Sequence, residues 1–106
     1  MRICILDGDE IKTRDMLHDI LSKTLDLPQW YGRNLDALYD CLTDMGEETE
    51  LQFWNMDALE VHLGSYGKAL LKVAYVAAEN NDKIRLAFKE DKKAEEAWQK
   101  GETEDE

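Results

Sequence analysis

The chain has 106 residues, of which 43% are hydrophobic and 35% are charged, so it is long enough to bury the core of one globular domain. Its 24 acidic and 13 basic residues give a net charge of −11, which argues against nucleic acid or an anionic membrane as a partner. Its two cysteines, Cys4 and Cys41, form no C-x-x-C pair and no metal-ligand spacing, so we expect neither a disulfide scaffold nor a bound metal or other cofactor.

The first predicted element is a short buried strand from Arg2 to Leu6, which ends at the turn-forming residues Asp7, Gly8 and Asp9. Its apolar run is too short for a signal peptide or a membrane span, so we expect a cytoplasmic protein with reduced cysteines. Two carboxylates directly after a strand also resemble the D-x-D loop of haloacid-dehalogenase-like phosphatases. Those enzymes need further catalytic segments and a longer chain, which favours an ordinary acidic turn and a protein that is not an enzyme.

A helix is predicted to begin near Thr13, because apolar residues recur from there on one helical face. This apolar stripe comprises Met16, Leu17, Ile20, Leu21 and Leu25. His18 has polar helical neighbours, and we expect it at the surface. The only proline, Pro28, ends this unit and opens a loop that leads to Asn34, a residue type that commonly caps helices.

The rest of the chain predicts two more strands with helices before each of them. A second helix is expected from Asn34 to about Met45, then a strand over 51–54, helices over 57–63 and from Ser65, and a strand over 83–88. The residues expected to face inward from the second helix are Leu35, Leu38, Cys41, Leu42 and Met45. This order favours an α/β fold with a small three-stranded parallel sheet flanked by helices. We assign residues 1–88 to this domain and residues 89–106 to a charged C-terminal extension, expected to be partly helical or disordered.

The second predicted helix carries an acidic stripe, because Asp36, Asp40 and Asp44 are spaced i, i+4 and i+8. Residues 34–67 hold eight acidic residues and no Lys or Arg, so no base offsets the repulsion within the stripe. Trp30 and Tyr31 precede the helix in a loop, and at least one of two adjacent rings usually packs onto the core. An exposed aromatic beside an acid cluster is typical of a protein interface, so we expect a positively charged partner here.

The segment from Leu27 to Thr43, LPQWYGRNLDALYDCLT, closely resembles the signature segment of the barstar family, the intracellular inhibitors of barnase-type ribonucleases. A weaker resemblance extends over residues 1–26 and 51–88. The resemblance implies a barstar-like three-stranded parallel sheet and a 1:1 complex in which the inhibitor blocks the active site of a basic ribonuclease. An immunity or binding module for a different toxin or basic protein is the alternative.

The resemblance also implies which residues contact the ribonuclease. Asp40 matches a central carboxylate that pairs with the arginines and the histidine that would hold the RNA phosphate. Asp36 matches a carboxylate that meets another arginine, and Trp30 matches an aromatic that stacks at the active site. The full predicted contact set is Trp30, Tyr31, Gly32, Asn34, Leu35, Asp36, Tyr39, Asp40, Thr43 and Met45.

Three residues depart from the family pattern. Arg33 replaces an acid and places a positive charge within an otherwise negative face, Met45 replaces a tryptophan, and Val76 falls where a distant helix would supply a further acidic contact. These departures bear on the identity of the target more than on the mode of binding.

Overall fold

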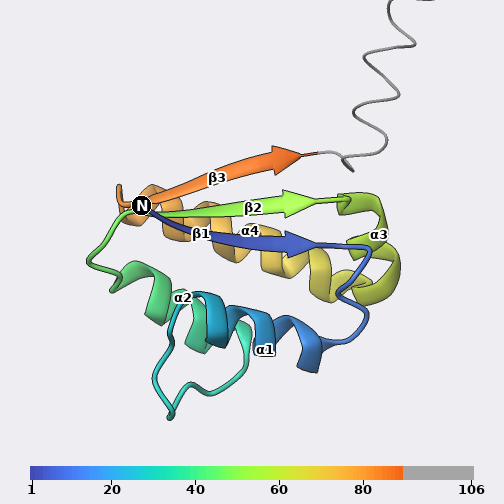
Figure 1. Ribbon diagram of the computed structural model, residues 1–106, viewed down its shortest axis with the longest axis horizontal. Helices are drawn as coiled ribbons and strands as arrows, with labels where there is room; N and C mark the ends of the chain where they lie inside the picture. Colours follow the sequence, from blue (N-terminus) through green and yellow to red (C-terminus); the bar gives the residue numbers. More distant parts are fainter. Residues whose placement is uncertain (90–106) are drawn as a thin grey trace, which may run out of the picture.

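The computed structural model describes residues 1–89 and places three parallel strands in one sheet, with two helices between each pair of strands (Figure 1). The elements are β1 (Arg2–Asp7), α1 (Arg14–Thr24), α2 (Leu35–Thr43), β2 (Thr49–Trp54), α3 (Met56–Leu63), α4 (Ser65–Asn80) and β3 (Ile84–Lys89). The predicted α/β class and the predicted order of elements are therefore confirmed. β3 includes Lys89, the first residue of the expected C-terminal extension, and the rest of that extension lies outside the described residues.

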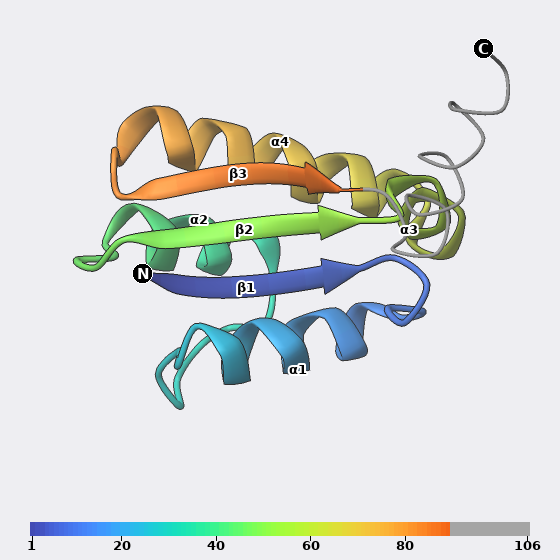
Figure 2. The ribbon, with the colours of Figure 1, turned by 45° about the horizontal axis from the view of Figure 1, so that its top comes forward.

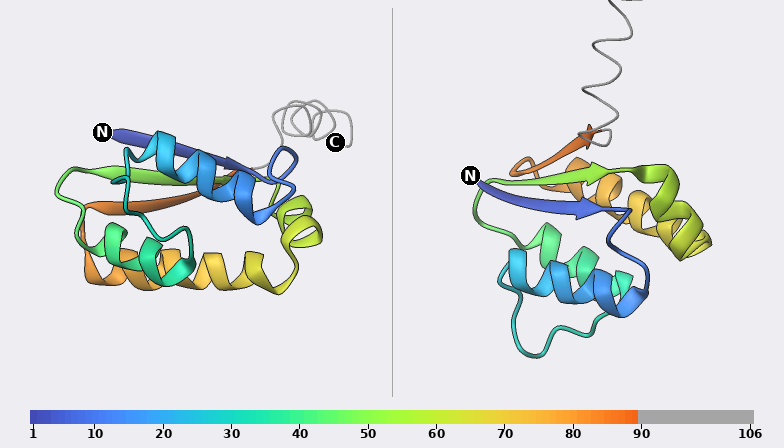
Figure 3. Two further views of the ribbon diagram at one scale, coloured as in Figure 1. Left: turned by 90° about the horizontal axis from the view of Figure 1, so that it is seen from below. Right: turned by 45° about the vertical axis from the view of Figure 1, so that its right-hand side comes forward.

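The strands lie side by side in the order β1-β2-β3, as Figure 2 shows, and both pairs are parallel. Right-handed crossovers between strands added in one direction place every connection on the same side of a sheet. The helices accordingly cover one face of the sheet and leave the other open (Figure 3). No helix within residues 1–89 is both long and apolar enough to cross a lipid bilayer.

The open face corrects the prediction that the first strand is buried. Cys4 and Leu6 on β1 are fully buried against the helices, whereas Ile3 and Ile5, which point to the other face, are 47% and 51% exposed. A continuous apolar run is typical of a strand in a sheet that is covered on both faces. The run alone therefore does not reveal that only one face of this sheet is covered.

The core lies between the sheet and the helices, and α2 packs directly beside α4 beneath it (Figure 3). Phe53, at the centre of the sheet, is fully buried. The predicted apolar stripe of α1 faces this core except for Met16, which is 40% exposed. The buried leucines of the core are Leu6, Leu17, Leu21, Leu25, Leu38, Leu42, Leu51, Leu59, Leu63 and Leu70.

Gly8 marks the closest approach between the end of β1 and the start of α3. Its backbone N–H donates to the carbonyl oxygen of Trp54 at 2.8 Å, which continues the pairing of β1 with β2. A Cβ atom on Gly8 would collide with the carbonyl oxygen of Asn55 and would lie 2.5 Å from the backbone nitrogen of Leu59. Only glycine fits here without a backbone shift.

His18 is buried, being 2% exposed, so the prediction of a surface histidine is wrong. Its Nδ1 lies 2.7 Å from the hydroxyl of Tyr31, and its Nε2 lies 2.8 Å from the hydroxyl of Tyr66. A neutral imidazole donates a hydrogen bond from one nitrogen and accepts one at the other. The uncharged ring can therefore form hydrogen bonds with both tyrosine hydroxyls. His18 precedes the buried Leu21 of α1 by three positions and the C-cap residue Leu25 by seven, and this spacing is the signal by which the sequence places it inside.

The surroundings of His18 favour its neutral form. Burial lowers its pKa from the ordinary value of 6.5, and the positive charge of Arg33 lowers it further. Asp15 and Asp19 on the same helix act in the opposite direction but do not outweigh the burial.

We expect Gly8→Ala to lower the free energy of unfolding by about 3 kcal/mol, because backbone atoms on both sides of the new methyl group must move. Urea denaturation of the two proteins measures the difference. Gly46→Ala is the matched control, since a Cβ atom there meets nothing within 4 Å. Equal losses at both positions would contradict the close approach at Gly8.

We expect the stability of the protein to fall as the pH drops below 6.5, the ordinary pKa of histidine. Below this pH, His18 binds a proton in the unfolded chain, whereas the buried imidazole of the folded protein stays neutral. The stability therefore falls with pH until the lowered pKa of His18 in the folded state is reached. Urea denaturation between about pH 7.5 and about pH 5.5 should give a flatter profile for His18→Gln than for the wild type. Parallel profiles for the two proteins would show that another group causes the pH dependence.

Candidate functional site

The N-terminus of α2 is fixed by Asn34, as predicted. Its backbone is extended, with φ −142° and ψ 170°, and its Oδ1 accepts the backbone N–H of Ala37 at 2.8 Å. Its Nδ2 donates to the carbonyl oxygen of Gly32 at 3.2 Å. A Cβ atom at Gly32 would lie only 3.1 Å from this Nδ2, so a small residue at position 32 leaves room for the cap.

α2 has an acidic face in solvent and an apolar face in the core. Asp36, Asp40 and Asp44 are exposed, while Leu38 and Leu42 are 1% and 0% exposed. Asp36 lies in the first turn, where the helix dipole stabilises a negative charge. Asp44 is the C-terminal cap residue, where the same dipole is unfavourable to a carboxylate. The predicted stripe is thus exposed along its whole length.

The two adjacent aromatic residues of the loop point in opposite directions. Trp30 is 81% exposed, whereas Tyr31 is 6% exposed and belongs to the core. The backbone N–H of Tyr31 donates to the carbonyl oxygen of Pro28 at 2.9 Å, and its hydroxyl bonds to His18. Tyr31 therefore lies mostly beneath the loop surface, and its place in the predicted contact set stays a prediction.

Arg33 joins the end of the loop to α1. Its φ of 55° lies in the left-handed region, and its Nη2 lies 3.0 Å from Asp19 Oδ1 and 3.5 Å from Asp15 Oδ1. The same nitrogen donates to the carbonyl oxygen of Asp15 at 3.1 Å. Arg33 is thus paired with α1, instead of standing unpaired within the acidic face as its sequence position suggests.

The half-buried members of the predicted contact set are Leu35, Tyr39, Thr43 and Met45. The Tyr39 hydroxyl accepts Nδ2 of Asn80 at 3.0 Å, which ties α2 to the end of α4. The Thr43 hydroxyl donates to the carbonyl oxygen of Tyr39 at 3.0 Å, and Met45 Sδ accepts from the hydroxyl of Thr49 at 3.1 Å. These four side chains border the acidic face while they also hold α2 in the fold.

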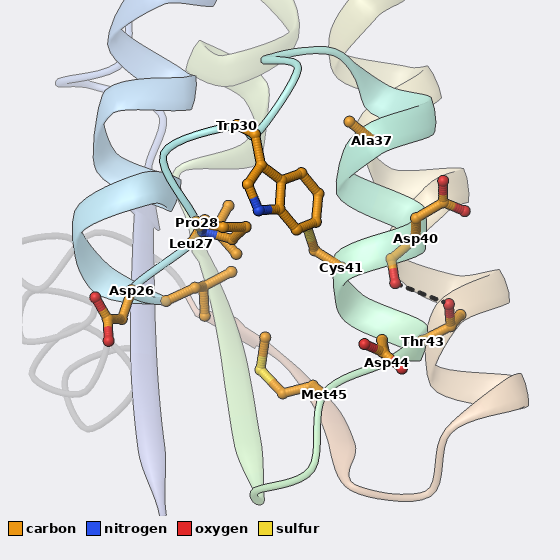
Figure 4. A pocket seen from close by; sticks show the side chains of 11 residues that line it. Asp26, Leu27, Pro28, Trp30, Ala37, Asp40, Cys41, Thr43, Asp44 and Met45 are labelled. Carbon is orange, nitrogen blue, oxygen red and sulfur yellow. Dashed lines mark hydrogen bonds between the residues drawn. The ribbon is translucent and has the colours of Figure 1, made fainter.

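A groove with a volume of about 600 Å³ separates the loop from the acidic side of α2 (Figure 4). It is lined by Leu25, Asp26, Leu27, Pro28, Trp30, Ala37, Asp40, Cys41, Thr43, Asp44 and Met45. Cys41 packs against the core, as predicted, but it is only half-buried and also lines this groove. Burial raises the pKa of its thiol, and the charges of Asp40 and Asp44 raise it further. The sequence holds no motif for the groove, because its two walls come from separate elements.

The acidic turn after β1 is hydrogen-bonded to the residue that precedes α3. Asp7 Oδ1 accepts the backbone N–H of Asp9 at 3.0 Å and Nδ2 of Asn55 at 2.8 Å. Within residues 1–89, no group of three or more His, Cys, Asp or Glu side chains is placed to hold a metal ion.

Comparison with known proteins agrees with this fold. The model of the family described as Barstar (barnase inhibitor) matches residues 1–99. A protein of Bacillus subtilis (strain 168) named "Putative ribonuclease inhibitor YrdF" is 42% identical over 80 residues, which cover 74% of this chain and 88% of that protein. The chain therefore belongs to the barstar family.

Proposed function

We propose that this protein inhibits a barnase-type ribonuclease by blocking its active site with the acidic face of α2 and the loop before it. The observation that carries the proposal is the pair Asp36 and Asp40, exposed one helical turn apart on a capped helix with no basic residue. Membership of the barstar family and the printed name of the Bacillus subtilis relative support the same activity.

The chemistry of the target explains why two fixed carboxylates suit it. A ribonuclease gathers cationic side chains around the scissile phosphate, because charge develops there in the transition state. Asp40 and Asp36 offer negative charge at a fixed spacing, and the burial of Leu38 and Leu42 behind them prevents the helix from shifting. The helix face thus acts as a protein mimic of the RNA backbone.

Trp30 supplies the part of the mimic that is not charged. Its indole is 81% exposed beside the acidic face, and its loop is held by the buried hydroxyl of Tyr31. An exposed aromatic on a fixed loop can stack on the partner with little loss of conformational entropy. We assign to Trp30 the stacking position that an RNA base would otherwise take.

The charge of the chain suits rapid association with a basic enzyme in a 1:1 complex. Residues 34–67 hold eight acidic residues and no Lys or Arg, so the negative field is strongest around α2. In this proposal the inhibitor acts inside the cell that makes the ribonuclease and protects that cell's own RNA.

We expect Asp40→Ala to weaken inhibition by about 30-fold or more, because the buried cations of the enzyme then lose their partner. The measurement is the rate of RNA cleavage by barnase, titrated with the wild type and with the variant. Asp40 is exposed in the free protein, so the variant should fold as the wild type does, which circular dichroism can check.

Glu60→Ala is the control, because Glu60 lies on α3, outside the predicted contact set. Inhibition should be unchanged in this variant. Equal losses at positions 40 and 60 would show that overall charge, and not the face of α2, causes inhibition. A wild type that does not inhibit barnase would point to a different toxin or basic protein, with Met45 and Val76 as the departures that redirect the face.

A further inference from the structure

We propose that the C-terminal extension covers the open face of the sheet and packs Trp98 against Ile3 and Ile5 of β1. The occupant of this face is thus a segment of the same chain. The contact is separate from the one proposed with a ribonuclease, because α2 lies on the other side of the sheet (Figure 3).

The open face of the sheet carries an apolar area that begins on the edge strand β1. Ile3 and Ile5 are 47% and 51% exposed, although isoleucine is among the residue types most often buried. Side chains alternate between the two faces of a strand, so Trp54 of β2 and Ala87 of β3 point to the same open face. All four helices lie on the other face (Figure 3), so no element within residues 1–89 covers this area.

The polar side chains in the middle of this face are hydrogen-bonded to one another. Nε1 of Trp54 donates to Oε1 of Gln52 at 3.1 Å, and Nε2 of Gln52 donates to Oε2 of Glu50 at 2.7 Å. The indole N–H and the amide oxygen therefore keep their partners when water is removed from the face. This pairing lowers the cost of covering the row with apolar side chains.

The extension has the residue pattern of a segment with one apolar side. Ala94, Ala97 and Trp98 are the only apolar residues of 90–106, and the spacing i, i+3 and i+4 places them on one face of a helix. Gly101 continues this row at i+7. The small residues allow the segment to approach the sheet closely, and Trp98 supplies the large apolar side chain that the exposed isoleucines lack as a neighbour.

The length and the starting point of the extension fit the open face. Residue 90 follows the carboxyl end of β3, so a covering segment runs back toward the amino ends of the strands. β3 has six residues and is about 20 Å long, a distance that about 13 helical residues span. Residues 90–106 provide this length together with a turn in front of it. Trp98 then lies near the middle of the strands, at the level of Ile5.

Charge favours the same direction of the chain. The extension ends in the acidic sequence Glu-Thr-Glu-Asp-Glu over residues 102–106, which this arrangement brings to the amino end of β3. Arg85 lies at that end and points to the open face, because it follows the buried Ile84. In the described part of the chain its guanidinium pairs with Glu48 alone, at 3.5 Å. The acidic terminus adds the further negative charge that this arginine can take.

A second copy of the chain is a less suitable occupant of the open face. Each chain carries a net charge of −11, so two copies repel each other. The extension, in contrast, is tethered to the edge of the face that it covers. Its effective concentration there is therefore high without any partner in solution.

Fluorine NMR of the full chain labelled with 5-fluorotryptophan tests whether Trp98 is covered. The chain has three tryptophans, and Trp30, which is 81% exposed, is the reference for an indole in water. Replacing each tryptophan in turn by phenylalanine assigns the three resonances.

On transfer from H₂O to D₂O, we expect the resonance of Trp98 to shift by about half as much as that of Trp30 or less, because a docked indole loses contact with water. The difference should be the same at low and at high protein concentration. Equal shifts for Trp98 and Trp30 would overturn the proposal. Protection of Trp98 that appears only at high concentration would also overturn it, because the cover would then be a second copy.

A double-mutant cycle on the full chain identifies the surface that Trp98 contacts. In urea denaturation, we expect Ile5→Ala and Trp98→Ala to be coupled by about threefold or more in the unfolding equilibrium constant. Ile5 is exposed within the described residues, so the variant should still fold. Trp30→Ala is the matched control, because Trp30 lies in the loop before α2, and its effect should simply add to that of Ile5→Ala. Additive effects of Ile5→Ala and Trp98→Ala, or equal coupling in the control, would overturn the contact with β1.

Discussion

The hydrogen bonds between His18 and the hydroxyls of Tyr31 and Tyr66 connect the three parts of the chain that surround the proposed contact face. One buried imidazole links α1, the loop before α2, and α4, at distances of 2.7 Å and 2.8 Å. Trp30 lies in the turn that the bond from the Tyr31 N–H to the carbonyl oxygen of Pro28 closes, and it stays exposed while its neighbour Tyr31 is held inside by His18.

In the proposed function, the acidic face of α2 serves binding at the expense of stability. Like charges one turn apart and a carboxylate at the C-terminal cap both destabilise a helix. Two features compensate for this cost, namely the Asn34 cap and the burial of the opposite face beside α4. An inhibitor that binds a cationic active site has to keep its charges unpaired until the partner supplies the counter-charges.

The fold gives the charge of Arg33 a different place from the one that its sequence position predicts. In the sequence it directly precedes Asn34 and lies three positions before Asp36, which predicts a positive charge within the acidic face. In the fold a left-handed backbone at Arg33 accompanies ion pairs with Asp15 and Asp19 on α1. Its charge thus anchors the loop, and the acidic face of α2 keeps its own carboxylates free of an intramolecular partner within the described residues.

The sequence by itself determined the three strands, the four helices, the parallel order, the Asn34 cap and the exposed stripe of Asp36, Asp40 and Asp44, because periodicity and capping are local properties. Only the tertiary structure decided that one sheet face stays open, that Tyr31 is buried while Trp30 is exposed, and that Cys41 lines a groove. Each of these depends on which distant segment lies opposite, and a local pattern carries no information about that. The groove is the clearest case, since its walls meet only when the loop folds back beside α2.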